Sequence, residues 1–379
     1  MIFLASKYNK IVVLPIRNNV ADCKYHLPEN IEVLNFEIYK PYNRIRTVFA
    51  NPGVLLSVLF CELRHSRNKS GYFRNAKKYF NYLLHAVNVS QRLQKEVIGK
   101  YGTKVTYYSF WFNIWVFYLS LIKKKENLKL ISRAHGGDYD ENQTKIFFPF
   151  RSFQMKNITA ISPVSDFGVN YLKRKYPFSR AVISRSYLGV RPSGINPFKA
   201  GDNFVLVSCS SLIALKRVEL IIDILKHTGF KLTWLHFGDG PLRENLLNKA
   251  KELPSNVTFD FRGHVTNETL LDFYKTNAVD LVINVSESEG IPVSLMEAIS
   301  FGIPVMGTAV CGVPEIVVEQ TGFLIPKDFD PKQTAELLTD YNKSSTERKL
   351  ELRTSAKEYW SRNFDLEVNY EKFFTTYLK

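Results

Sequence analysis

The sequence predicts an α/β protein of two domains, each built on a parallel sheet. The chain has 379 residues, more than one ordinary domain contains, and 45% of them are hydrophobic, which is enough for two cores. Short apolar runs typical of buried strands alternate with segments typical of helices, a pattern that favours parallel sheets covered by helices. Residues 188–203 are rich in Gly and Pro and form the expected linker.

The N-terminal domain is expected to span residues 1–190. Its strands are expected at residues 10–15, 104–109, 129–133, 158–162 and 181–185, and its helices at 73–99 and 165–176. Residues 105–122 contain no charged side chain, and 18 residues is the lower limit for a bilayer span. Three polar residues interrupt this run and its start is β-branched and aromatic, so we expect a buried strand that leads into a buried helix.

The C-terminal domain is expected to span residues 203–355 and alternates more regularly. Its strands are expected at residues 203–209, 231–237, 257–261, 279–285 and 303–307, and its helices at 217–228 and 241–252. We find no internal repeat and no low-complexity segment.

The net charge of +15 is concentrated in the first half of the chain. Residues 1–195 contain 31 Lys and Arg but only 11 Asp and Glu, whereas the remainder is net acidic. A basic half favours an anionic partner, and both an anionic membrane surface and nucleic acid fit that description. No recognisable nucleic-acid-binding motif is present, so nucleic acid is the weaker alternative and is not an expected partner.

The cysteines and the first residues bear on location. Cys23, Cys61, Cys209 and Cys311 are scattered without metal-binding spacing, and the last two fall in apolar runs, so we expect buried thiols in a reducing compartment. No secretory signal follows Met1. We therefore expect a cytoplasmic protein.

The most informative feature is a pair of glutamates, Glu289 and Glu297, eight positions apart. The expected strand at 279–285 precedes them, Gly290 frees the backbone to turn, and Pro292 suits the first turn of a helix. Glu289 should therefore lie on a loop and Glu297 in the first two turns of that helix. A helix N-terminus suits phosphate, and ionised carboxylates accept hydrogen bonds from hydroxyls. Together they predict a nucleotide-sugar site.

This stretch resembles the E-x7-E signature of retaining GT-B glycosyltransferases of family 4. The segments FGIPVMGT, GVPEIV and TGFLIP, at residues 301–308, 312–317 and 321–326, follow in the order of that family. The resemblance implies a GT-B fold, in which two Rossmann-like domains with parallel sheets face a central cleft. It also implies transfer of a sugar from a nucleotide-diphosphate donor, with no metal and no other cofactor.

The resemblance assigns roles in the second half. Glu289, one of two implied catalytic residues, would hold hydroxyls of the transferred sugar, and Glu297 would bind the ribose. Lys216 resembles the family's diphosphate-binding lysine, but the family's arginine five positions earlier is replaced by Ser211. Serine can donate a hydrogen bond to phosphate but brings no charge. The other implied donor-binding residues are Gly238, Val265, Gly290, Ile291, Pro292 and Val293.

In the first half, residues 132–141 resemble the family's RAHG element, which makes His135 the second implied catalytic residue. It follows an expected strand end, where α/β proteins bind ligands. Asp138 and Asp140 have the spacing of a metal-binding pair, but the family does not need a metal. Residues 107–111 and 161–172 resemble a bacterial branch that assembles capsule, O-antigen or exopolysaccharide, which implies a lipid-linked oligosaccharide acceptor.

An acceptor of that kind implies a location on the inner face of the plasma membrane. The expected membrane contacts combine basic and aromatic residues, with inward packing of the aromatics as the alternative. They are Arg64, Arg67, Lys69, Arg74, Lys77, Lys78, Tyr72, Phe73, Tyr79 and Phe80.

Both ends of the chain enter the comparison with the family. Residues 356–379 resemble the family's closing helix, which returns to the first domain. The first residues resemble the end of the family's first helix and its second strand, so the opening strand and Gly-rich loop are expected to be missing. That departure and Ser211 leave open an N-terminally truncated or inactive homologue that acts as a partner subunit.

Overall fold

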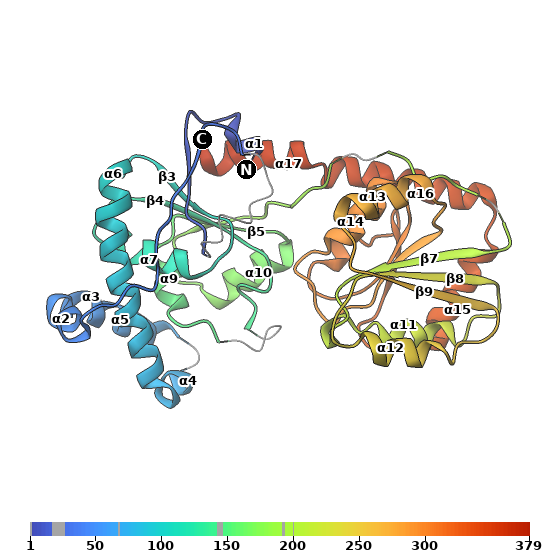
Figure 1. The fold of residues 1–379 in the computed structure, drawn as a ribbon, viewed down its shortest axis with the longest axis horizontal. Helices are drawn as coiled ribbons and strands as arrows, with labels where there is room; N and C mark the ends of the chain where they lie inside the picture. Colours follow the sequence, from blue (N-terminus) through green and yellow to red (C-terminus); the bar gives the residue numbers. More distant parts are fainter. Residues whose placement is uncertain (1, 17–26, 67–68, 142–146, 192–193, 200) are drawn as a thin grey trace. The chain divides into compact units, whose positions relative to one another are not determined.

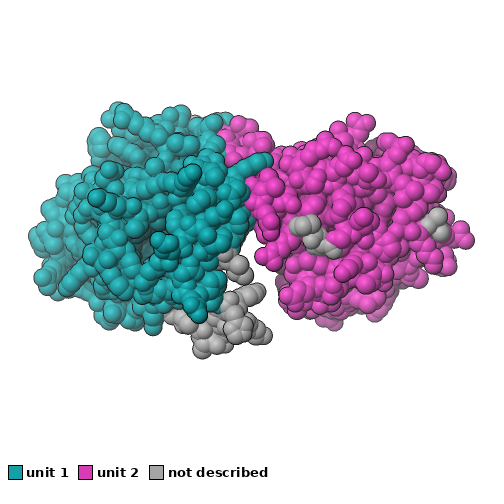
Figure 2. All heavy atoms as spheres, turned by 90° about the horizontal axis from the view of Figure 1, so that it is seen from above, with its two compact units in different colours: residues 1–162, 171–184, 370–379 teal, residues 163–170, 185–369 magenta. Residues whose placement is uncertain are grey.

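The chain folds as two compact units in a computed structural model that describes residues 2–16, 27–66, 69–141, 147–191, 194–199 and 201–379 (Figure 1). Unit 1 comprises residues 1–162, 171–184 and 370–379, and unit 2 comprises residues 163–170 and 185–369 (Figure 2). The chain passes from unit 1 to the main part of unit 2 at residue 185, just before the Gly- and Pro-rich segment 188–203. Residues 192, 193 and 200 of that segment lie outside the described part.

The described residues of unit 1 form two sheets whose described strand pairs are parallel. The first pairs β1 (Ile11–Val13) with β2 (Ile31–Val33), and the second has the strand order β3-β4-β5-β6. The strands of the second sheet are β3 (Thr106–Ser109), β4 (Lys129–Ala134), β5 (Ala160–Pro163) and β6 (Val182–Ile183). All five strands expected in the first half are present, whereas β2 was not expected.

Some helices of unit 1 pack on this second sheet, and others pack mainly on neighbouring helices. They are α1 (Ile2–Ala5), α2 (Arg44–Ala50), α3 (Pro52–His65), α4 (Lys69–Arg74), α5 (Ala76–Leu93), α6 (Gly99–Tyr101), α7 (Ile114–Lys123) and α9 (Arg151–Asn157), with α10 (Asp166–Lys175) shared between the units. The uncharged run 105–122 forms β3 and the buried α7, as expected. The helix expected over 73–99 is divided, because Asn75 has non-helical backbone angles and residues 94–98 form a π-helical turn.

Unit 2 is built on one six-stranded parallel sheet with the order β12-β11-β10-β7-β8-β9. Its strands are β7 (Phe204–Cys209), β8 (Leu232–Phe237), β9 (Val257–Gly263), β10 (Leu281–Asn284), β11 (Val305–Thr308) and β12 (Gly322–Ile325). The first five confirm the strands expected in the second half. β12 was not expected, because it is short and its residues are mostly part-exposed at the edge of the sheet.

Helices cover both faces of this sheet (Figure 1). One face packs on α13 (Asn267–Thr276), α14 (Val293–Ser300) and α16 (Thr346–Asn363), and the other on α11 (Glu219–Leu225), α12 (Arg243–Ala250) and α15 (Pro331–Lys343). Each face has its own apolar core, because successive strand residues point to opposite faces. Leu206 belongs to one core and Val207 to the other. This is the doubly wound arrangement that the alternation predicted.

A polar network joins the neighbouring strands β7 and β8 of unit 2. The Ser208 hydroxyl accepts from the Trp234 indole N–H at 2.9 Å and contacts His236 Nδ1 at 2.8 Å, while His236 Nε2 lies 3.1 Å from the Ser210 carbonyl. His236 is fully buried, and burial lowers its pKa to about 4. The neutral imidazole therefore has both nitrogens satisfied inside the sheet.

The C-terminal helix differs from the expectation of one helix over 356–379. α16 begins earlier, at Thr346, and ends at Asn363, since Phe364 leaves the helical region. α17 (Leu366–Phe373) and a π-helical turn, Phe374–Leu378, follow. Residues 370–379 belong to unit 1, where the Arg133 guanidinium lies 4.4 Å from the Phe373 ring centroid.

No single helix in the described part of the chain has both the length and the apolar composition to cross a bilayer. Taken together, α2 and α3 have that length and apolar composition, but the two helices meet at an angle of 83° around Asn51. Cys61 is buried, Cys209 and Cys311 are only partly buried, and Cys23 lies outside the described residues.

Candidate active site

The two glutamates of the motif lie where the sequence predicts them. β10 ends at Asn284, a loop carries Glu289, and α14 begins at Val293. Glu297 is the fifth residue of α14 and is buried. In a parallel sheet, loops after the carboxyl ends of the strands line the usual ligand site. Glu289 therefore lies at the carboxyl ends of the strands of the unit 2 sheet, where ligands usually bind in such folds.

Glu289 forms an ion pair with the predicted diphosphate-binding lysine. Lys216 Nζ lies 2.6 Å from Glu289 Oε1, with 21% and 12% of the two side chains exposed. Asn284 Nδ2 and Ser286 Oγ donate to the same oxygen at 3.1 and 2.7 Å. No described residue donates to Oε2 of Glu289. The sequence reasoning assigned Lys216 and Glu289 to one site but did not foresee that they bind each other.

Arg217, a residue that the sequence reasoning missed, holds the loop that carries Lys216 against the loop that carries Glu289. Lys216 ends a 3-10 turn that follows β7, and Arg217 adopts a left-handed conformation with φ 49°. The Arg217 guanidinium donates to the Val285 carbonyl at 2.8 Å, and the Glu287 amide donates to the Leu215 carbonyl at 2.8 Å. Nothing in the local sequence signals this role, since the contact joins residues 68 positions apart.

Glu297 has a second partner that the sequence did not indicate. Asn267 Nδ2, at the start of α13, donates to Glu297 Oε1 at 2.7 Å. Burial raises the pKa of Glu297, and the Asn267 hydrogen bond partly offsets that rise. The contact ties Glu297, the implied ribose-binding residue, to the start of α13, two residues after Val265, another implied donor-binding residue.

The start of α14 differs in detail from the prediction. Pro292 is the N-cap residue, just before the first helical turn, and gives the first amides no side-chain cap. Gly290 is absent from the glycines with positive φ among the described residues, so the loop does not require its conformational freedom. The constraint lies on Gly312, where a Cβ would stand 2.1 Å from the Gly290 carbonyl oxygen.

The side chains around that turn are divided between core and surface. Ile291 is buried in the core beneath α14, so only its backbone is available to a ligand. Val293 is exposed at the helix start. The uncapped N-terminus and the positive end of the helix dipole suit a negatively charged group.

The remaining implied donor-binding residues surround the lysine. Ser211 is exposed on the loop after β7, and its side chain is available to a ligand. Gly238 has φ 141°, and a Cβ there would stand 1.9 Å from the Ser210 carbonyl oxygen. Glycine is therefore required at this position by the neighbouring protein backbone. Val265 is partly buried between β9 and α13.

His135 belongs to unit 1, whereas the other candidate site residues belong to unit 2. It follows β4, and its ring lies 4.2 Å from the Trp111 ring and 4.7 Å from the Phe110 ring between centroids. Asp138 Oδ1 accepts from the His135 amide at 2.7 Å, and Oδ2 accepts from the Phe112 amide at 2.9 Å. The Asp138 carboxylate is thus engaged by backbone amides. In the described part of the chain, no three His, Cys, Asp or Glu side chains gather as metal ligands.

The geometry of unit 2 provides three elements of a phosphate and hydroxyl site at one sheet edge. A lysine ammonium supplies positive charge, two carboxylates supply hydrogen-bond acceptors, and an uncapped helix start supplies amides. These groups can bind a phosphorylated sugar, but the lysine and Glu289 must first separate or share the ligand between them.

Sequence comparison finds similarity to known proteins over the same region. Residues 195–359 match the model of the family described as glycosyl transferases group 1. A putative colanic acid biosynthesis glycosyltransferase WcaL of Escherichia coli strain K12 is 25% identical over 216 residues, covering 54% of this chain and 53% of the relative. The GtfA subunit of a UDP-N-acetylglucosamine–peptide N-acetylglucosaminyltransferase of Streptococcus agalactiae is 29% identical over 36% of this chain and 28% of that one. The chain spans about half the length of the first of these relatives.

Solved structures share the fold over more of the chain. Anabaena Alr3699/HepE in complex with UDP has a TM-score of 0.61 at 16% identity, covering 77% of this chain and 81% of that chain. The lipopolysaccharide outer core galactosyltransferase WaaB has a TM-score of 0.61 at 18% identity, with 79% and 81% covered. At this identity the likeness establishes the fold, and the fold is the GT-B type expected from the sequence.

Proposed function

We propose that the protein is a glycosyltransferase that moves a sugar from a nucleotide-diphosphate sugar to a growing bacterial surface polysaccharide. The observation that supports this most directly is the Lys216–Glu289 pair at the sheet edge of unit 2, beside the uncapped start of α14. Transfer breaks the bond between the anomeric carbon and a diphosphate oxygen and forms one to an acceptor hydroxyl oxygen. Negative charge develops on the leaving diphosphate, where a lysine ammonium and helix amides stabilise it.

Each residue then has a part in donor binding. Lys216, with Ser211 and the first amides of α14, binds the diphosphate. Glu297 accepts from the ribose hydroxyls, and Glu289 accepts from hydroxyls of the transferred sugar. For His135, in unit 1, the catalytic role implied by the family resemblance stays a prediction.

Further parts of the proposal follow the family and the relatives. Retention of the anomeric configuration, independence of a metal and a lipid-linked oligosaccharide acceptor are the family's properties. The colanic acid relative supports polysaccharide biosynthesis. A place on the cytoplasmic face of the plasma membrane follows from such an acceptor.

A second candidate function is that of a non-catalytic partner subunit. Ser211 brings no charge to the phosphate position, and one of the relatives is itself named as a subunit. A partner subunit can keep the donor site, so nucleotide binding alone does not separate the two functions. Only the enzyme transfers the sugar to an acceptor, so turnover separates them.

Two experiments separate these functions. Isothermal titration with UDP, GDP and ADP and their sugars measures donor binding, and Lys216→Ala is compared with Lys327→Ala. Lys327 is a matched control because it pairs with the exposed Glu287 at 3.5 Å, close to the site but outside it. Absence of binding to every nucleotide would refute the donor site.

Incubation of the protein with nucleotide sugars and a lipid-linked acceptor, followed by mass analysis, then measures transfer. A sugar added to the acceptor supports the enzyme. Nucleotide binding without any transfer favours the partner subunit.

A further inference from the structure

The outer side of α2 and α3 exposes an apolar surface that no described segment of the chain covers. Its five large side chains are between 51% and 80% exposed. They are Ile45, Phe49, Leu56, Phe60 and Leu63, called here the α2–α3 face. A contiguous exposed patch of large apolar side chains is uncommon and marks an interaction site.

The spacing of these residues shows that the exposure is a property of whole helix faces. Ile45 and Phe49 are four residues apart on α2, and the three residues on α3 follow a spacing of four and three. Side chains at that spacing lie on one side of a helix. The opposite side of α3 carries Leu55, Val58 and Cys61, which are buried where α3 packs on α9. α3 therefore has two apolar sides, and only one of them is used inside the unit.

The charges in the chain segment that contains α2 and α3 are almost all positive. Between residues 38 and 95 the chain has 11 Lys and Arg and a single acid, Glu62. That acid is buried, and it accepts from the Phe153 amide at 2.7 Å and from the Tyr72 hydroxyl at 3.0 Å. The exposed surface of this segment is therefore apolar and basic, with no exposed carboxylate among its described residues.

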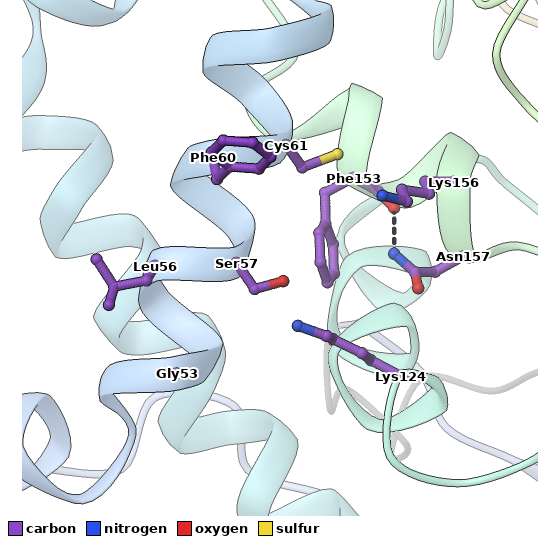
Figure 3. A pocket seen from close by; sticks show the side chains of 9 residues that line it. All are labelled: Gly53, Leu56, Ser57, Phe60, Cys61, Lys124, Phe153, Lys156 and Asn157. Carbon is purple, nitrogen blue, oxygen red and sulfur yellow. Dashed lines mark hydrogen bonds between the residues drawn. The ribbon is translucent and has the colours of Figure 1, made fainter.

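A cavity beside the face adds two lysines. It has a volume of about 520 Å³ and is lined from α3 by Gly53, Leu56, Ser57, Phe60 and Cys61, and from the neighbouring helices by Lys124, Phe153, Lys156 and Asn157. Ser57 and Lys124 point toward each other across it (Figure 3). Both lysines are exposed, and neither has a carboxylate partner in the described part of the chain. Burial raises the pKa of the Cys61 thiol to about 11, while the two lysines, which are close enough to act on it, oppose the rise.

We propose that the α2–α3 face docks on an anionic phospholipid bilayer, with its apolar side chains in the interface and Lys124 and Lys156 against headgroup phosphates. Apolar side chains flanked by basic ones are the composition of interfacial helices. Basic residues gain roughly 1 kcal/mol each near an anionic leaflet. The bend of 83° between α2 and α3 lets both lie on a surface without crossing it. A second copy of this chain fits less well, because it would bring like charges together.

This assignment differs from the membrane contacts expected from the sequence. Tyr72 and Tyr79 of that set face inward, where both rings pack against Phe147. Phe73 is exposed, and Arg67 lies outside the described residues. Apart from Arg64 in the last turn of α3, the contacts expected from the sequence lie after α3, whereas the five exposed apolar side chains of the α2–α3 face lie on α2 and α3.

The test is flotation of the whole protein with vesicles that contain neither acceptor nor nucleotide. Vesicles of 70% phosphatidylcholine and 30% phosphatidylglycerol are compared with pure phosphatidylcholine vesicles. The proposal rests on the proposed membrane location but not on transfer, so a failure here leaves donor binding and turnover to be judged by their own assays. We expect binding to the anionic vesicles that is at least tenfold stronger than to neutral ones and that weakens in high salt.

Two double variants test the two parts of the surface. Leu56→Ser with Phe60→Ser should weaken partition at least tenfold by removing apolar area. Lys124→Gln with Lys156→Gln should weaken it by about 30-fold on anionic vesicles and leave neutral vesicles unaffected.

Matched controls in unit 2 are Leu337→Ser with Leu350→Ser, and Lys332→Gln with Lys343→Gln, because these residues are also exposed. Thermal unfolding should be unchanged in all four double variants, since the replaced side chains are exposed.

Three results would overturn the proposal. One is equal partition of the serine double variant and the unmodified protein. Another is equal binding to neutral and anionic vesicles. The third is a dimer in sedimentation equilibrium that the serine variant dissociates, without any vesicle binding, which would assign the face to a second copy.

Discussion

Replacing Glu289 by Gln should separate nucleotide binding from catalysis and change them in opposite directions. Glu289 Oε1 accepts a hydrogen bond from Lys216 Nζ at 2.6 Å. A diphosphate must draw that ammonium away before the lysine can bind it. Gln keeps the shape of the side chain and removes the charge, so the lysine becomes available to the nucleotide without competition.

The expected size of the effect follows from the burial of the pair. A hydrogen bond between charged groups contributes about 1.5–3 kcal/mol net, and the lower end applies here because both side chains are partly exposed. About 1.4 kcal/mol corresponds to tenfold in affinity. The Kd for UDP should therefore fall by up to about tenfold. Turnover should fall on the order of 10²-fold, because a carboxylate that acts in the transition state is lost.

The assay is titration calorimetry with UDP alone, paired with turnover measured on the same preparation. Glu287→Gln is the control, since Glu287 lies two positions away and its pairing with Lys327 is 3.5 Å long and exposed. It should change neither quantity. A tenfold or greater weakening of UDP binding in Glu289→Gln would refute the competition between glutamate and diphosphate.

Three other changes have definite expected outcomes. Lys216→Met should weaken UDP binding about 10- to 100-fold in calorimetry, and an unchanged Kd would remove the lysine from the diphosphate site. Gly238→Ala should lower the melting temperature by several degrees, because its Cβ would stand 1.9 Å from a carbonyl oxygen, whereas Gly229→Ala, with open space around it, should not. His236 has a folded pKa of about 4, below the unfolded 6.5, so its own contribution to the free energy of unfolding should be constant above pH 6.5 and fall by up to about 3 kcal/mol toward pH 4. Urea titrations of His236→Gln should lack that slope, and an equal slope in both proteins would contradict the buried-imidazole account.

The second half of the chain was predictable because its strands and loops are regular. The strands β7, β8, β10 and β11 are mostly apolar runs of four to six residues, and such runs mark buried parallel strands, whereas β9 alternates apolar and exposed polar residues. The position of Glu289 on a loop and of Glu297 in α14 followed from Gly290 and Pro292, although the residue with the tight backbone contact is Gly312. The pattern thus identified the turn correctly and the constrained glycine wrongly.

Contacts between distant segments were not predictable from the sequence. Asn267 reaches Glu297 across 30 positions, and Arg217 reaches the Val285 carbonyl across 68. Neither residue type is unusual for its place, since Asn suits a helix start and Arg is common on surfaces. Such pairs follow from the order of strands in the sheet, which alternation alone does not determine.

The helices of the first half were harder to predict from the sequence, because several of them do not show a single apolar stripe. α3 has apolar side chains on both sides, so its periodicity does not stand out, and neither α2 nor α3 was expected. α7 is buried on all sides, so it has no polar side and no apolar stripe. It was predicted instead from the uncharged run 105–122. Periodicity is informative only when one side of a helix meets water.

Because Lys216 and Glu289 neutralise each other, the candidate site of unit 2 presents little net charge to passing ions at this point. A simple anion such as sulfate gains the lysine only by stranding a half-buried carboxylate, so it should bind weakly. A molecule that carries a diphosphate at one end and hydroxyl or ammonium groups at the other replaces both halves of the pair at once. Inhibitors of that mixed character should outperform phosphate mimics, and fragment screens that use anions alone should find few hits here.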